Sequence, residues 1–139
     1  MSNPVPAAVR GAGLIVALQG VAALALAAVL LLRGLTGADQ RVVNSFGTAG
    51  WFALVGGAVS AAGRALMVGR RWGRGLAVVT ELLLLPVAWY LAVDSARPLA
   101  GVTVASVALS VLALLFSPAA VRWVAAARPG STRSRADTR

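Results

Sequence analysis

The chain has 139 residues, of which 59% are hydrophobic and 12% are charged, and its formal net charge is +9. Soluble domains usually contain about 45–50% apolar and about 25% charged residues, so this chain has too little polar surface to coat itself in water. It contains no cysteine and no histidine. Disulfides, thiolate metal sites, cysteine nucleophiles and histidine acid–base catalysis are therefore excluded.

The basic residues flank apolar stretches instead of forming a stripe on a soluble fold. All thirteen of them are arginine, and the positive-inside rule of membrane proteins accounts for their placement without a nucleic acid. No nucleic-acid partner is expected. The all-arginine set, with abundant Ala, Val and Gly, is typical of a GC-rich bacterial genome.

Four apolar stretches are long enough to cross a bilayer, whose hydrocarbon core needs about 20 helical residues. They follow a short, proline-containing N-terminal segment, residues 1–10, which is expected on the cytoplasmic side. The first stretch exceeds the roughly 7–15-residue core of a secretory signal, so it is predicted to be an uncleaved membrane helix. The predicted spans are residues 11–32, 46–68, 75–93 and 99–116.

The second predicted span carries small residues at spacings of three or four, which place them on one helix face. We expect this face to pack closely against another helix. In the polar loop before it, residues 33–45, Asn44 or Ser45 is a candidate N-cap. The small residues are Gly47, Gly50, Ala53, Gly57 and Ala61.

The third and fourth spans are joined to their neighbours by short segments. A basic turn, residues 69–74, precedes the third span, in which Pro86 is expected to kink the helix. Ser117 and Pro118 then resemble a helix start, with Ser as N-cap and Pro at the first helical position. Two interpretations of residues 117–128 stay open: a helix on the membrane surface with Trp123 in the interface, or a kinked continuation of the fourth span.

The arginines also predict an orientation. Four spans place both termini on one side, and that side carries most of the arginines, including those of the disordered basic tail predicted for residues 129–139. The other side carries Arg33, Arg41 and Arg97. We therefore predict an all-α polytopic protein of the bacterial cytoplasmic membrane, an antiparallel four-helix bundle with both termini in the cytoplasm.

Arg64 and Glu81 are the charged residues inside the predicted spans. A rise of 1.5 Å per residue places each about 9–10 Å from the basic turn, so an ion pair between them is expected. Gln19 and Ser110 fall at a comparable depth and complete a predicted polar layer. An isolated charge in the bilayer core costs at least about 2.5–3.5 kcal/mol, which pairing or protonation reduces.

This polar layer has two interpretations. In the favoured one it holds the four helices in register, and in the other Glu81 is a proton or cation site in a transport path. The basic turn and the segment after the fourth span also supply candidate contacts to anionic lipids, although topology alone would explain them equally well. Those candidates are Arg70, Arg71, Arg74 and Arg122.

No catalytic constellation, phosphate-binding glycine loop or metal-ligand cluster is visible in the sequence. We therefore expect no enzymatic activity and no cofactor. The expected function is that of an accessory, interaction or scaffolding subunit whose partners are the bilayer and other membrane proteins or further copies of itself. The alternative is a small proton- or cation-coupled transporter, or a channel-like oligomer, centred on Glu81.

Three segments together resemble a group of small four-helix integral membrane proteins of high-GC Gram-positive bacteria. These are GRALMVGRRWGRG, LLLLPVAWYL and LLFSPAAVRW, which begin at Gly63, Leu82 and Leu114. That group has no assigned activity, so the resemblance implies location and topology and no binding residues. Small multidrug transporters share the four-span size, but they carry a key Glu in the first span, where this chain has Gln19.

Overall fold

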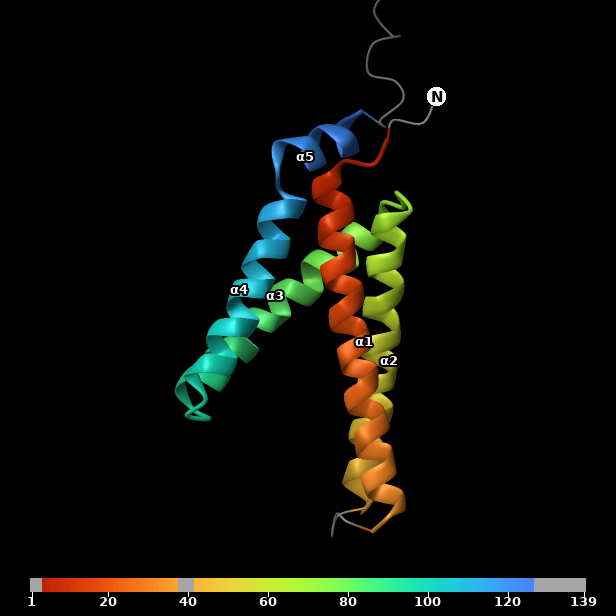
Figure 1. The fold of residues 1–139 in the computed structure, drawn as a ribbon, viewed down its shortest axis with the longest axis vertical. Helices are drawn as coiled ribbons and strands as arrows, with labels where there is room; N and C mark the ends of the chain where they lie inside the picture. Colours follow the sequence, from red (N-terminus) through yellow and green to blue (C-terminus); the bar gives the residue numbers. More distant parts are fainter. Residues whose placement is uncertain (1–3, 38–41, 127–139) are drawn as a thin grey trace, which may run out of the picture.

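The computed structural model describes residues 4–37 and 42–126, which form five helices (Figure 1). Four of these helices are long and apolar enough to cross a membrane. The predicted all-helical class with four candidate spans is therefore confirmed. The tail predicted for residues 129–139 lies outside the described residues. The helices are α1 (Ala7–Leu35), α2 (Val42–Met67), α3 (Trp72–Val93), α4 (Pro98–Leu115) and α5 (Pro118–Ala125).

The first two helices are longer than the apolar stretches that predicted them. α1 begins and ends beyond the predicted span of 11–32, so Arg10 and Arg33 are helical. Long arginine side chains can leave their stems on an apolar surface and extend the charge outward, so a helix need not end at them. α2 starts at Val42, and the expectation that Asn44 or Ser45 caps it is wrong, because both lie inside the helix.

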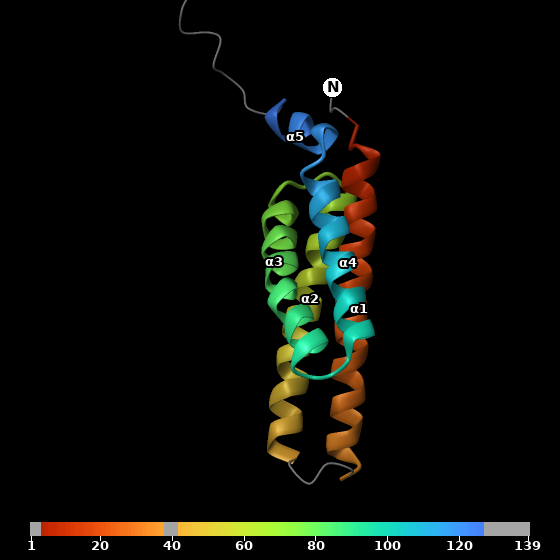
Figure 2. The same cartoon turned by 90° about the vertical axis from the view of Figure 1, so that its left-hand side faces the viewer.

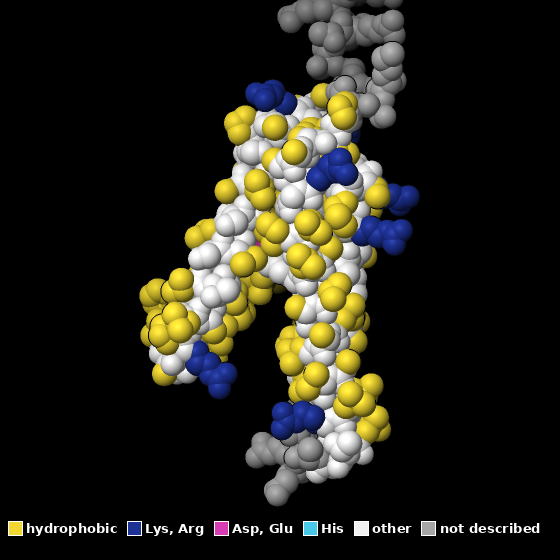
Figure 3. Space-filling view, in the orientation of Figure 1, with side chains coloured by type: hydrophobic (Ala, Val, Ile, Leu, Met, Phe, Trp, Pro, Cys, Tyr) yellow, Lys and Arg dark blue, Asp and Glu magenta, His cyan; other side chains and the backbone are white. Residues whose placement is uncertain are grey.

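The four long helices form two pairs. α1 and α2 lie side by side over most of their length, and α3 and α4 form the second pair (Figures 1 and 2). Contacts between the pairs are far fewer than those within them. The pairs meet at the end where α5 lies and diverge toward the other end, where the space-filling view shows an opening between them (Figure 3). We call this space the opening.

Glycines bring the backbones of α1 and α2 into contact. A Cβ at Gly63 would lie 2.6 Å from the carbonyl oxygen of Gly13, and a Cβ at Gly56 would lie 2.9 Å from that of Gly20. Gly13 and Gly20 are seven residues apart on α1, and Gly56 and Gly63 are seven residues apart on α2. This spacing, about two turns, places both glycines of a helix on the same face. The α1–α2 pair therefore depends on a small-residue contact of the kind found between membrane helices.

The small-residue face predicted for the second span is not the face that makes this contact. A Cβ at Gly47, Gly50 or Gly57 would meet no other atom within 4 Å, and Ala53 and Ala61 are exposed. Adjacent residues of a helix point about 100° apart, so Gly56 and Gly57 face different surroundings. The spacing of small residues was correctly identified, but α1 packs against the neighbouring face.

The core lies at the end of the molecule where the two pairs meet, and all five helices contribute to it. Trp123 of α5 is only 9% exposed, and its ring packs in this cluster. The placement of this helix on the membrane surface stays a prediction. α5 is not a continuation of α4, because Ser117 between them is extended (φ −58°, ψ 150°) and its Oγ accepts a hydrogen bond from the Ala120 amide at 3.4 Å. The buried cluster comprises Val9, Ala12, Val16, Val59, Leu66, Ala77, Val111, Leu115, Ala120 and Trp123.

Candidate functional site

A buried carboxyl group links the two helix pairs. Glu81 of α3 is 0% exposed. Among the described residues, it is the charged side chain that is buried. Gln19 of α1 reaches it, and the Gln19 Nε2 donates a hydrogen bond to the Glu81 Oε2 at 3.3 Å. Since α1 and α3 belong to different pairs, this hydrogen bond ties the pairs together close to where they begin to diverge.

We call Gln19 and Glu81 the polar cluster, and each of these side chains has an oxygen atom that makes no hydrogen bond to the part of the chain that the structure describes. Within the described residues, the Oε1 atoms of Glu81 and Gln19 are buried and have no protein hydrogen-bond partner. Buried polar atoms in native proteins nearly always have a partner. The cluster is therefore where the molecule has capacity for a proton, a water molecule or a small cation.

Two members of the predicted polar layer lie elsewhere. Arg64 is exposed and does not contact the Glu81 carboxylate, so the expected ion pair is wrong. Ser110 is exposed and its Oγ donates to the carbonyl oxygen of Ser106 on its own helix at 2.7 Å. Depth along a helix follows from residue counting, but the direction of a side chain around the axis depends on which neighbour the helix packs against.

Two of the four candidate lipid-binding arginines contact other parts of the protein. The Arg74 Nη2 donates to the carbonyl oxygen of Leu115 at 3.0 Å, and its guanidinium lies 5.3 Å from the centre of the Phe116 ring. The Arg71 guanidinium lies 5.6 Å from the centre of the Trp123 ring. These contacts fasten the start of α3 to the end of α4 and to α5. Sequence reasoning missed these contacts.

The other two lipid candidates are not engaged in this way. Arg70 and Arg122 are both exposed. Among the described residues neither of them lies over an aromatic ring, whereas Arg71 and Arg74 each do.

Replacing Arg74 with alanine is expected to lower the free energy of unfolding by about 2 kcal/mol. The change removes a charge-assisted hydrogen bond to a carbonyl oxygen and a cation–π contact. Urea denaturation in detergent micelles, followed by circular dichroism, measures the loss. Arg122→Ala is the control: this exposed arginine of α5 should change the value by less than about 0.5 kcal/mol, and an equal loss in both variants would contradict the assignment.

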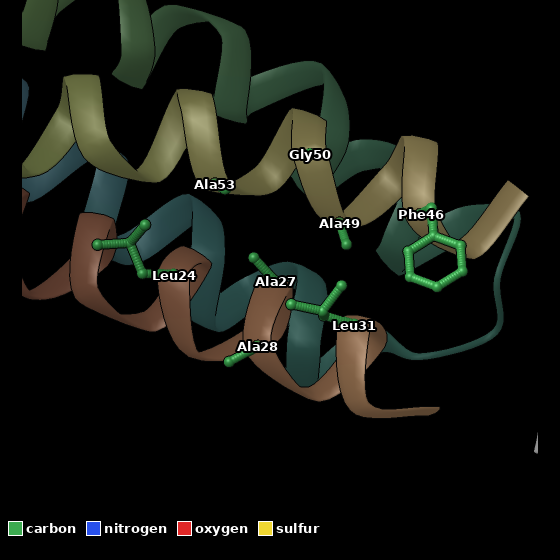
Figure 4. A pocket seen from close by; sticks show the side chains of 8 residues that line it. All are labelled: Leu24, Ala27, Ala28, Leu31, Phe46, Ala49, Gly50 and Ala53. Atoms are coloured by element: carbon green, nitrogen blue, oxygen red, sulfur yellow. The ribbon is translucent and has the colours of Figure 1, made fainter. Parts of the chain in front are cut away.

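An apolar pocket of about 380 Å³ lies between α1 and α2, away from the polar cluster (Figure 4). Phe46, Leu24 and Leu31 supply its larger side chains, and alanines and a glycine supply the rest. It offers no polar side chain that would orient or activate a substrate, so it suits an apolar group such as a lipid chain.

Comparison with known proteins gives no template for this site. No family model matches the sequence, and no curated protein or solved structure matches it either. Among residues 4–37 and 42–126, no group of three or more Asp, Glu, His or Cys side chains is placed to hold a metal ion. The candidate site therefore consists of the Gln19–Glu81 pair and the opening beside it.

Proposed function

We propose that this chain is an accessory or scaffolding subunit of the bacterial cytoplasmic membrane that docks a helix of a partner protein. In this proposal the four spans cross in alternating directions and both termini are cytoplasmic. The arginine distribution supports the orientation, because the end that carries α5 also carries the basic turn of residues 69–74. The resemblance to small membrane proteins of high-GC Gram-positive bacteria agrees with this location.

The opening between the helix pairs is the observation that carries the proposal. Its walls are apolar helices: α4 has no charged residue, and α1 has none between Arg10 and Arg33. Leu26 belongs to the α1 wall of the opening. It lies seven residues beyond Gln19, which places it on the same helix face, and it is 43% exposed. A single apolar transmembrane helix fits such a site, since it satisfies its own backbone hydrogen bonds and brings only apolar side chains.

Site-specific crosslinking tests the docking of a partner helix. The chain has no cysteine, so Leu26→Cys introduces one thiol at the opening and Leu54→Cys introduces a matched thiol on the exposed outer face of α2. In native membranes we expect Leu26→Cys to crosslink one defined position in the membrane span of one partner, and a cysteine placed at that partner position to crosslink back. Equal labelling of both sites by a lipid-soluble thiol reagent, with no reciprocal crosslink, would contradict the proposal.

A second function is favoured by one specific feature, the fully buried Glu81 with an Oε1 that lacks a protein partner. In that function Glu81 exchanges a proton or cation during transport through the opening. The Glu81→Gln variant distinguishes the docking function from the transport function. The glutamine keeps the shape of the side chain and its contact with Gln19, but it cannot ionise. Under the docking proposal the variant keeps the Leu26→Cys crosslink, and neither protein carries proton flux in proteoliposomes. Flux that is present in the wild type and lost in the variant establishes transport instead.

A further inference from the structure

A surface hollow of about 550 Å³ lies on the outer side of α2, beside the turn that leads to α3. Two arginines and a tryptophan meet there: Arg64 from α2, Arg70 from the turn, and Trp72 from the first residue of α3. Small and apolar residues of α2 and of the turn that follows it complete the lining. They are Ala61, Ala65 and Val68.

Among the residues that the structure describes, the two guanidinium groups in this hollow have no counter-ion. Arg64 and Arg70 are exposed, and no hydrogen bond or ion pair joins either side chain to the described residues. The acidic side chains that the structure describes are distant from them: Glu81 is buried against Gln19, and Asp94 follows the far end of α3. The hollow is therefore a local concentration of positive charge that a ligand can neutralise.

The position of Arg64 suits a ligand at the membrane surface. This residue lies in the last turn of α2, so its Cα is about 5 Å from the end of the helix by helical rise, and a long arginine side chain can direct its charge from that depth toward the interface. Arg71 and Arg74, by contrast, are directed toward Trp123, Phe116 and Leu115 on the other side of the turn.

An apolar track leads from the arginines into the region of the spans. Ala61 lies in the hollow, and Gly57 lies one turn further along the same face of α2. A Cβ at Gly57 would meet no atom within 4 Å, so the surface is shallow and open there. The Trp72 side chain is 54% exposed and lies beside the two arginines at one end of this track. Amphipathic rings of this kind are typical of membrane interfaces.

We propose that this hollow binds one anionic phospholipid. Arg64 and Arg70 hold the phosphate, because guanidinium groups bind phosphate oxygens through paired, charge-assisted hydrogen bonds. Trp72 packs against the glycerol region, and one acyl chain follows Ala61 and Gly57 along α2. The site is independent of the docking proposal, since it lies on the outward face of α2 and the opening lies between the helix pairs.

Native mass spectrometry of the full chain, titrated with phosphatidylglycerol or phosphatidylcholine, tests this site. We expect phosphatidylglycerol to bind more tightly, and Arg64→Gln and Arg70→Gln each to weaken it about fivefold, as expected for the loss of one cationic contact near a membrane surface. Arg122→Gln is the matched control, an exposed arginine of α5 outside the hollow, and it should leave the affinity unchanged. Gly57→Leu should weaken binding while all arginines are retained.

Three results would overturn the proposal. Arg122→Gln could weaken binding as much as Arg64→Gln, which would show a diffuse basic surface. Phosphatidylcholine could bind as tightly as phosphatidylglycerol, which would show that charge plays no part. Inorganic phosphate could displace the lipid at equal concentration, which would show a site for a free anion in which the acyl track contributes nothing.

Discussion

Replacing Gly63 with leucine is expected to separate α1 from α2, and even Gly63→Ala should lower the free energy of unfolding by about 3 kcal/mol. A Cβ at this position would lie 2.6 Å from the carbonyl oxygen of Gly13 and 2.7 Å from the Cα of Ala17. Both atoms belong to the backbone of α1, so they cannot move aside as the end of a flexible side chain can. Overpacking of this kind typically costs about 1–3 kcal/mol, and more where the backbone must move.

Gly57 provides the matched control on the same helix. Its Cβ would meet nothing within 4 Å, so Gly57→Ala should be neutral or stabilise the helix by up to about 1 kcal/mol through its higher helix propensity. Denaturation of both alanine variants in the same detergent, monitored by far-ultraviolet circular dichroism, measures the difference. Equal stability of the two variants would show that α1 and α2 do not pack through Gly63.

The second large effect is expected at Glu81, where alanine should lower the free energy of unfolding by about 3 kcal/mol. The change leaves a cavity where a fully buried side chain stood, and it removes the acceptor for the Gln19 Nε2. A buried donor without its partner costs about 1–3 kcal/mol. Because this hydrogen bond joins α1 to α3, the loss should also widen the distance between spin labels placed on the two helix pairs.

A double-mutant cycle with Gln19 separates the hydrogen bond from the cavity. In the Glu81→Leu, Gln19→Leu double variant, two apolar side chains of similar size replace the polar pair, so no buried donor or acceptor is left unpaired. We expect this variant to be more stable than Glu81→Leu alone, with a coupling energy within the range of about 0.5–3 kcal/mol seen for contacting residues. Additive effects would mean that the two side chains do not interact.

Local sequence properties predicted the elements of this fold. Hydropathy and length identified four stretches that the structure forms as four long apolar helices, because the need to bury apolar side chains and to satisfy backbone groups acts on each segment separately. The Ser117–Pro118 signal likewise predicted a helix start, and α5 begins at Pro118. Counting from the basic turn also placed Gln19 and Glu81 at similar depth, and the structure joins them.

The tertiary structure decided which way each helix face turns. Glu81 pairs with Gln19 and not with Arg64, and α1 packs against Gly56 and not against its neighbour Gly57. In each case the two alternatives lie at a similar depth along the helices, so one-dimensional spacing cannot separate them. The rotation of a helix about its axis is set by the shape of the surfaces that it packs against, which come from segments distant in the sequence.

The sequence by itself therefore determined that four stretches form long apolar helices and which of their ends carry arginines. Only the tertiary structure decided that Trp123 is buried under Arg71, that the helix pairs diverge, and that Arg64 and Arg70 share one hollow. The physical reason is that hydrophobic length is a property of a single segment, whereas close packing of glycines and side chains is a property of two surfaces in contact.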